Sequence, residues 1–111
     1  MAKSGKKERS VALYEAVLAL KDVEECCRFF DDLCTENELR SMEQRFDVAC
    51  YLLQGKVYTE ILEKTGAGSA TVSRVRRNIL DHASGGMLRE VIQRMEQESE
   101  TAKADGDKVY E

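Results

Sequence analysis

Apolar residues recur at helical spacing along most of the chain. A first stripe begins at Val11, and a second, from Val23 to Leu33, keeps the same period after Asp22. Apolar positions three and four residues apart lie on one face of a helix. The pattern therefore predicts two amphipathic helices in the first third of the chain, with Ser10 as a candidate cap for the first. Such stripes are typical of a core or a dimer seam rather than of a cofactor site.

The clearest helix start in the sequence is Thr35-Glu36-Asn37-Glu38. The Thr35 hydroxyl can accept a hydrogen bond from the Glu38 amide, and the Glu38 carboxylate can accept one from the Thr35 amide. This capping box predicts a helix that begins behind Thr35 and runs to about Gln54. Gly55 suits its C-terminal end, because glycine readily adopts the left-handed backbone that often follows a helix.

Two short helices joined by a glycine turn are expected next, at residues 57–65 and 69–80. The turn requires a residue that tolerates a left-handed backbone, and Gly66 supplies it. The helices also require apolar residues that hold them together, at fixed distances before and after this glycine. Together the glycine turn and the apolar anchors predict a helix-turn-helix over about residues 57–82. The apolar anchors are Ile61, Val72 and Val75.

The ends of the chain lack this pattern. Residues 1–8 are polar and lysine-rich, which predicts a disordered basic arm, and residues 100–111 have no apolar period, which predicts a disordered tail. A break at Ser84-Gly85-Gly86 precedes a last predicted helix, from Met87 to about Glu98. The sequence thus predicts one helical domain over residues 9–99.

Composition supports an all-α domain and excludes several classes of protein. The chain has 111 residues, enough for one domain, and it contains no proline and no apolar run that could span a membrane. We also expect no signal peptide, because no apolar run follows the basic N-terminus. The net charge is −4, yet residues 54–82 carry five basic against three acidic side chains. An acidic total does not forbid binding to DNA when a basic face is local.

The second helix of the predicted motif has an outward face that could contact DNA. The helical period turns its small and basic residues away from Val72, Val75 and Ile79. Small side chains let the helix approach base edges, hydroxyls bind phosphates or bases, and arginine binds guanine or phosphate. A solvated arginine face on an ordinary helical hairpin is the alternative. The predicted DNA-binding residues are Gly68, Ser69, Ala70, Thr71, Ser73, Arg74, Arg76 and Arg77.

The sequence contains no pattern typical of an enzyme or a metal site. The cysteines form no C-x-x-C pair, and His82 is the single histidine. There is no nucleophile motif and no phosphate-binding glycine loop. We therefore expect no catalytic residue, no metal and no cofactor, and we interpret the cysteines as free thiols in a reducing cytoplasm. They are Cys26, Cys27, Cys34 and Cys50.

Residues 34–80 resemble the Trp repressor superfamily. The resemblance rests on Thr35 with its acidic cap, on Gln44-Arg45, on Leu52-Leu53-Gln54-Gly55, and above all on the segment from Gly66 to Arg74. It implies an all-α, six-helix subunit that intertwines with a second copy and acts as a transcriptional repressor. The two reading helices would lie about 34 Å apart and read a palindromic operator. The chain is most similar to a branch distinct from the tryptophan-operon repressor.

The resemblance also implies a pocket for a small effector. Arg45 and Arg74 correspond to the two arginines that sandwich the ligand in the family, and Thr35 to the threonine of that site. Val75 replaces a glycine that makes room for the ligand, and Asn78 replaces a serine. Because Val75 adds an isopropyl group where a ring would need space, we expect that tryptophan is not the effector.

A second functional class stays open at this point. A related head also occurs in the bacterial replication initiator, so the fold alone does not prove regulation. The alternative is a module that binds DNA without sequence preference or that binds other proteins through its helices. The two hypotheses differ in one respect, because only the first predicts an operator.

Overall fold

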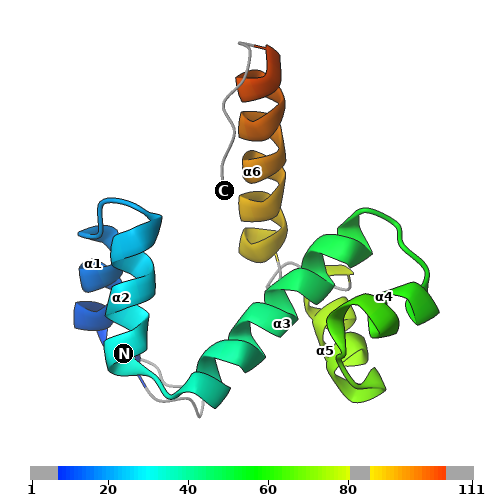
Figure 1. Ribbon diagram of the computed structural model, residues 1–111, viewed down its shortest axis with the longest axis horizontal. Helices are drawn as coiled ribbons and strands as arrows, with labels where there is room; N and C mark the ends of the chain where they lie inside the picture. The colour runs from blue at the N-terminus through cyan, green and yellow to red at the C-terminus, as the bar shows by residue number, and fades with distance from the viewer. Residues whose placement is uncertain (1–7, 81–85, 105–111) are drawn as a thin grey trace. The chain divides into compact units, whose positions relative to one another are not determined.

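The computed structural model describes residues 8–80 and 86–104. Within these ranges the chain forms six α-helices and no strand, as Figure 1 shows, so the predicted all-α, six-helix fold is confirmed. The helices are α1 (Val11–Leu18), α2 (Val23–Leu33), α3 (Glu36–Leu53), α4 (Tyr58–Thr65), α5 (Ser69–Leu80) and α6 (Gly86–Ala104). Residues 1–7 of the predicted basic arm, most of the glycine break and the last seven residues lie outside the described ranges.

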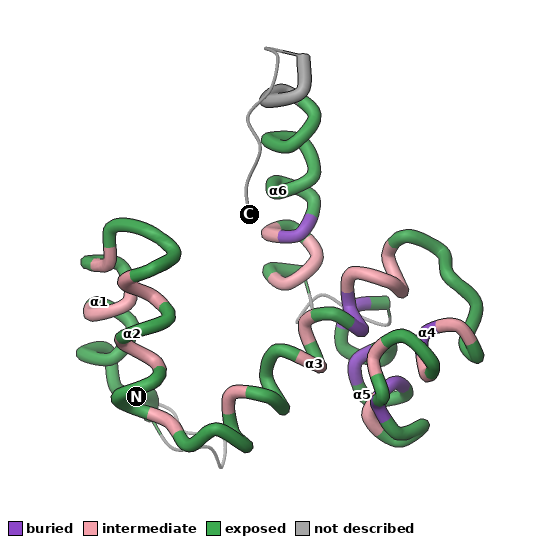
Figure 2. The backbone as a smooth tube through the Cα atoms, viewed as in Figure 1, coloured by how far each residue is buried: buried purple, intermediate pink, exposed green. Residues whose placement is uncertain are grey.

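The chain divides into two compact units, residues 1–39 and residues 40–111. The first unit contains α1, α2 and the start of α3. No residue of α1 or α2 is buried, as Figure 2 shows. Phe29 and Phe30 pack edge to face, with 5.1 Å between their ring centroids. The amphipathic pattern predicted for α2 is present, but α1 is apolar on nearly all sides, so the prediction of an amphipathic face was wrong for α1.

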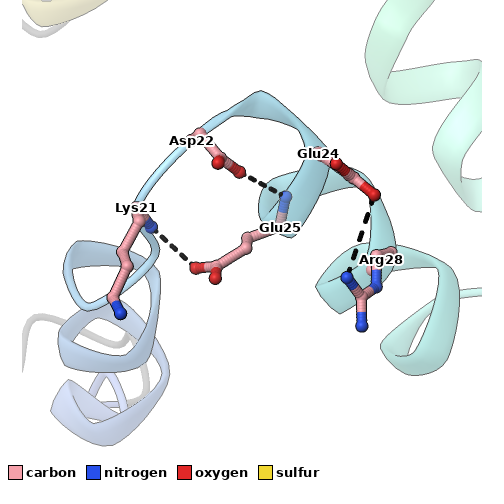
Figure 3. A network of polar contacts seen from close by, with 5 residues as sticks. All are labelled: Lys21, Asp22, Glu24, Glu25 and Arg28. Atoms are coloured by element: carbon pink, nitrogen blue, oxygen red, sulfur yellow. Dashed lines mark hydrogen bonds and ion pairs between the residues drawn. The ribbon is translucent and has the colours of Figure 1, made fainter.

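Hydrogen bonds at the start of α2 stabilise the first unit (Figure 3). Asp22 Oδ1 accepts from the Glu25 amide, and Glu25 Oε1 accepts from the Lys21 amide, both at 2.9 Å. Arg28 pairs with Glu24 at 3.9 Å. The sequence reading missed this cap, although an aspartate followed three residues later by a glutamate is a usual start signal. Ser10 occupies the N-cap position of α1, as expected, but its side chain makes no capping hydrogen bond.

The capping box predicted for α3 is confirmed, because both of its reciprocal hydrogen bonds are present. The Thr35 amide donates to Glu38 Oε1 at 2.8 Å, and the Glu38 amide donates to Thr35 Oγ1 at 3.1 Å. The C-terminal end of α3 matches its prediction to within one residue. Gly55 has a φ of 82°, and the Lys56 amide donates back to the Tyr51 carbonyl at 3.1 Å, which closes the helix.

The core of the described residues lies in the second unit and joins α3, α4, α5 and α6. Each of these helices contributes at least one buried apolar side chain, and the turn between α4 and α5 contributes an alanine. Figure 2 shows the buried positions gathered on this unit. Helices α4 and α5 are therefore packed against α3 and α6 through this core. The buried residues are Val48, Ala49, Ile61, Ala67, Val72, Val75, Ile79 and Ile92.

The last helix differs from its prediction. It was expected to end near Glu98, but α6 continues to Ala104, inside the segment expected to be disordered. The reason is that residues 97–104 are rich in glutamate, glutamine, alanine and lysine, which favour helix without an apolar face. A helix that is already nucleated adds such residues at little cost.

Candidate nucleic-acid interface

The turn between α4 and α5 has the geometry predicted for it. Gly66 has a φ of 71°, in the left-handed region, and its amide donates to the Leu62 carbonyl at 2.9 Å. Thr65 Oγ1 donates to the Ile61 carbonyl at 2.7 Å and accepts from the Ala67 amide at 3.1 Å. The direction in which α5 leaves α4 is therefore fixed by hydrogen bonds as well as by packing.

Helix α5 has one buried and one exposed face, as predicted. Val72, Val75 and Ile79 are at most 3 % exposed. The small and basic residues face the solvent, except Thr71, which is half-buried. The division of the helix is thus confirmed, and contact of the exposed face with DNA stays a prediction. The exposed residues are Ser69, Ala70, Ser73, Arg74, Arg76 and Arg77.

The exposed face of α5 carries an unneutralised positive charge. None of Arg74, Arg76 and Arg77 forms an ion pair with another residue in the described part of the chain. The first turn of the helix contains no acidic residue. Positive charge without an internal partner attracts phosphate, and the N-terminal end of the helix does so separately; Arg77 itself lies in the last turn. The electrostatics therefore suit a polyanion on this face.

Gly68 stands at the N-terminal end of α5, where its carbonyl accepts from the Val72 amide at 3.1 Å. Of the described glycines, Gly55 and Gly66 have positive φ and Gly68 does not. A Cβ built on Gly68 would meet nothing within 4 Å. The fold of this chain therefore does not require glycine here, and the missing side chain leaves room for a body outside the chain to approach the backbone.

A pocket of about 220 Å³ lies within the second unit, between α3, α5 and α6. It contains three of the five residues predicted for an effector site, namely Arg45, Val75 and Asn78. Arg74 is exposed and does not line it, and Thr35 caps α3 in the first unit. The grouping of all five residues stays a prediction. Sequence reasoning missed the other lining residues because it assigned them only to apolar helix stripes; they are Met42, Phe46 and Leu88.

The cysteines are free thiols, and no group of three potential metal ligands forms among the described residues. Burial raises the pKa of the Cys50 thiol, and the nearby charges of Asp47 and Glu96 raise it further. A raised pKa keeps the thiol protonated and unreactive at neutral pH. No helix in the described ranges is long and apolar enough to cross a membrane. His82 lies outside those ranges.

Comparisons with known proteins give a consistent result. The family model described as Trp repressor protein matches residues 8–99. A curated relative, the uncharacterized protein YerC of Bacillus subtilis (strain 168), is 55 % identical over 65 residues, which are 59 % of this chain and 62 % of the relative. The match thus spans less than two thirds of that relative's length.

Two solved structures have a similar fold and similar sequences. A TrpR-like protein from Eubacterium eligens ATCC 27750 is 44 % identical, with a TM-score of 0.71, over 77 % of this chain and 86 % of that one. A proposed Trp repressor from Staphylococcus aureus is 41 % identical, with a TM-score of 0.72, over 79 % and 89 % of the two chains. The helix arrangement found here is therefore shared by solved proteins.

Proposed function

Because the chain belongs to the Trp repressor family, we propose that it is a transcriptional repressor that binds a palindromic operator as a homodimer. The observation that carries this proposal is the two-sided helix α5. Its inner face is anchored by Val72, Val75 and Ile79, and its outer face offers arginines without ion-pair partners in the described chain. Such a protein would act on chromosomal DNA in the cytoplasm.

In the proposed complex, the N-terminal half of α5 enters the major groove. The open space at Gly68 lets the backbone approach the DNA, and the exposed hydroxyls of Ser69 and Ser73 bind phosphates or base edges. Arg74 and Arg77 supply charge and bind guanine or phosphate. The local positive charge supplies affinity, and the base contacts supply the choice of sequence.

The homodimer is supported by the exposed apolar residues of the N-terminal helices. Leu18 is 85 % exposed and Val23 is 77 % exposed, although both lie on helices with an apolar period. A second copy that covers these faces would remove apolar surface from water, which is the main driving force for association. The dimer would then fix the separation of the two α5 helices, and a bound operator would exclude the polymerase.

We also propose that any effector of this protein is not tryptophan. Val75 is 3 % exposed and lines the pocket between α3, α5 and α6, where its methyl groups occupy space. At about 220 Å³ the pocket is below the usual range of ligand sites, which begins at about 300 Å³. Candidate ligand-binding residues are Thr35, Arg45, Arg74, Val75 and Asn78.

In vitro selection of bound DNA tests the proposed function. The protein is incubated with random duplexes, with and without a pool of metabolites, and bound DNA is sequenced. The expected product is a palindrome whose half-sites lie about 10 base pairs apart, one turn of the helix. If the enriched duplex binds no better than its scrambled version, the chain is a module without sequence preference, and the proposed repressor function is wrong.

A further inference from the structure

Helix α5 is held at its C-terminal end by a side chain from another helix. Arg89 of α6 donates from Nη2 to the carbonyl oxygen of Ile79, in the last turn of α5. The last four carbonyls of a helix lack partners within the helix and carry its negative dipole end, so a guanidinium is a suitable partner. Hydrogen bonds to a charged donor are also stronger than neutral ones.

Packing alone does not account for an arginine at this position. Its Nε atom is buried and has no hydrogen-bond partner among the described residues. Burying a polar group without a partner is unfavourable, so an apolar side chain of similar length would fill the same space at lower cost. What the arginine provides, and methionine would not, is the hydrogen bond to Ile79.

The segment that leads into α5 is held in a similar way. Gln44 of α3 donates from Nε2 to the carbonyl oxygen of Thr65 at 3.1 Å, across 21 residues of sequence. Thr65 is the last residue of α4, directly before the left-handed Gly66. The same Gln44 nitrogen lies 3.9 Å from the position of a Cβ built on Gly66. This contact ties the turn to the core helix α3.

We infer that Gln44 and Arg89 are positioning residues that set the direction of α5 for reading DNA, an inference that rests on the proposed function. The aliphatic contacts under α5 are not directional and fix mainly its depth. Hydrogen bonds are directional: Arg89 holds the C-terminal end of α5, and Gln44 holds the turn that leads into α5, at the last residue of α4. Base contacts require accurate placement of α5, whereas phosphate attraction tolerates a small rotation.

The test compares Arg89→Met and Gln44→Leu with matched controls on α6. Arg94→Met removes an exposed arginine that pairs only locally, with Glu90 at 2.8 Å, and Gln93→Leu removes an exposed glutamine. The probes are the duplex most enriched by the wild-type chain and its scrambled version. We expect each positioning variant to lower the ratio of the two affinities about tenfold, the scale set by losing one hydrogen bond. Both controls should keep the wild-type ratio.

Amide hydrogen exchange without DNA gives an independent result. Arg89→Met should speed exchange in the last turn of α5, and Gln44→Leu should speed it around Ala67, whereas the controls should not. Arg89→Lys, which keeps the charge and a donor, should restore part of the affinity ratio. If Arg89→Met loses helical content by circular dichroism, Arg89→Gln replaces it in both measurements.

The outcomes separate this inference from the proposed function. If the wild-type chain selects no duplex, the repressor function fails, and amide exchange alone then decides whether the two side chains hold α5. If the wild type selects an operator but the positioning variants keep the ratio of the controls, the inference is overturned. It is also overturned if Arg89→Met leaves exchange in the last turn of α5 unchanged and Gln44→Leu leaves exchange around Ala67 unchanged.

Discussion

The two units of the chain differ in how far their helices bury apolar side chains. In the second unit, the apolar faces of α3 to α6 meet one another, and Ile61 and Val72 are fully buried. In the first unit, α1 and α2 also carry many apolar residues, yet neither helix buries a residue. The second unit thus has a core of its own, whereas α1 and α2 have exposed apolar residues, which we proposed a second copy of the chain would cover.

This difference shows what helical periodicity can and cannot specify. The period identifies which face of a helix is apolar, but it does not identify what covers that face. The first unit compensates locally through hydrogen bonds at helix starts, such as those of Asp22 and Thr35. Such caps are worth about 1 kcal/mol each, so they define helices without supplying the stability of a core.

The largest expected effect tests the core of the second unit. Ile61→Ala removes a fully buried side chain that packs α4 against the core of the second unit. Substitutions of this kind leave a cavity, so the free energy of unfolding should fall by about 2–5 kcal/mol. The measurement is urea unfolding followed by circular dichroism. Ile61→Val should lose only about 0.5–1.5 kcal/mol. Equal stability of Ile61→Ala and wild type would contradict the core described here.

The next effect tests whether a second copy covers the first unit. Leu18→Ala should leave the second unit folded but weaken dimerisation about tenfold to hundredfold. The reason is that a leucine buried against a partner contributes about 1.5–3 kcal/mol. Sedimentation at several protein concentrations measures the dissociation constant. Glu15→Ala, at an exposed position of the same helix, is the control. If the wild-type chain is monomeric at all concentrations, the proposal that a second copy covers the first unit is wrong.

The smallest expected effect is on stability, and it compares alanine substitutions at the two glycines that flank Ala67. Gly66→Ala places a side chain at φ 71° and should destabilise the protein by about 1 kcal/mol. Gly68→Ala meets open space without a positive φ, but alanine caps a helix less well than glycine, so stability should change by less than about 1 kcal/mol, while binding to DNA weakens. Thermal unfolding and DNA titration of both variants test this. Unchanged DNA affinity in Gly68→Ala would show that nothing approaches the backbone there.

Much of the site could be predicted from the sequence, because its determinants are local. The bonds between Thr35 and Glu38 join residues three apart, and the left-handed turn at Gly66 depends on a single residue. The faces of α5 follow from the helical period. Asp22 was missed although its signal was local too.

The contacts at the turn before α5 and at the C-terminal end of α5 could not be predicted in this way. Gln44 and Thr65 are 21 residues apart, and Arg89 and Ile79 are ten residues apart on different helices. Which side chains meet across such distances depends on how the helices pack, which periodicity does not specify. The pocket has the same origin, because Leu88 joins it from α6 while Arg45 joins it from α3.

The salt dependence of DNA binding tests the central claim, that the exposed arginines of α5 contact DNA. The affinity for the selected duplex is measured by fluorescence anisotropy from low to moderate salt, for wild type and Arg77→Ala. We predict that log affinity falls linearly with log salt, and that Arg77→Ala reduces the slope by about 1 for a lost phosphate contact. Affinity that is independent of salt and unchanged in Arg77→Ala would contradict the account.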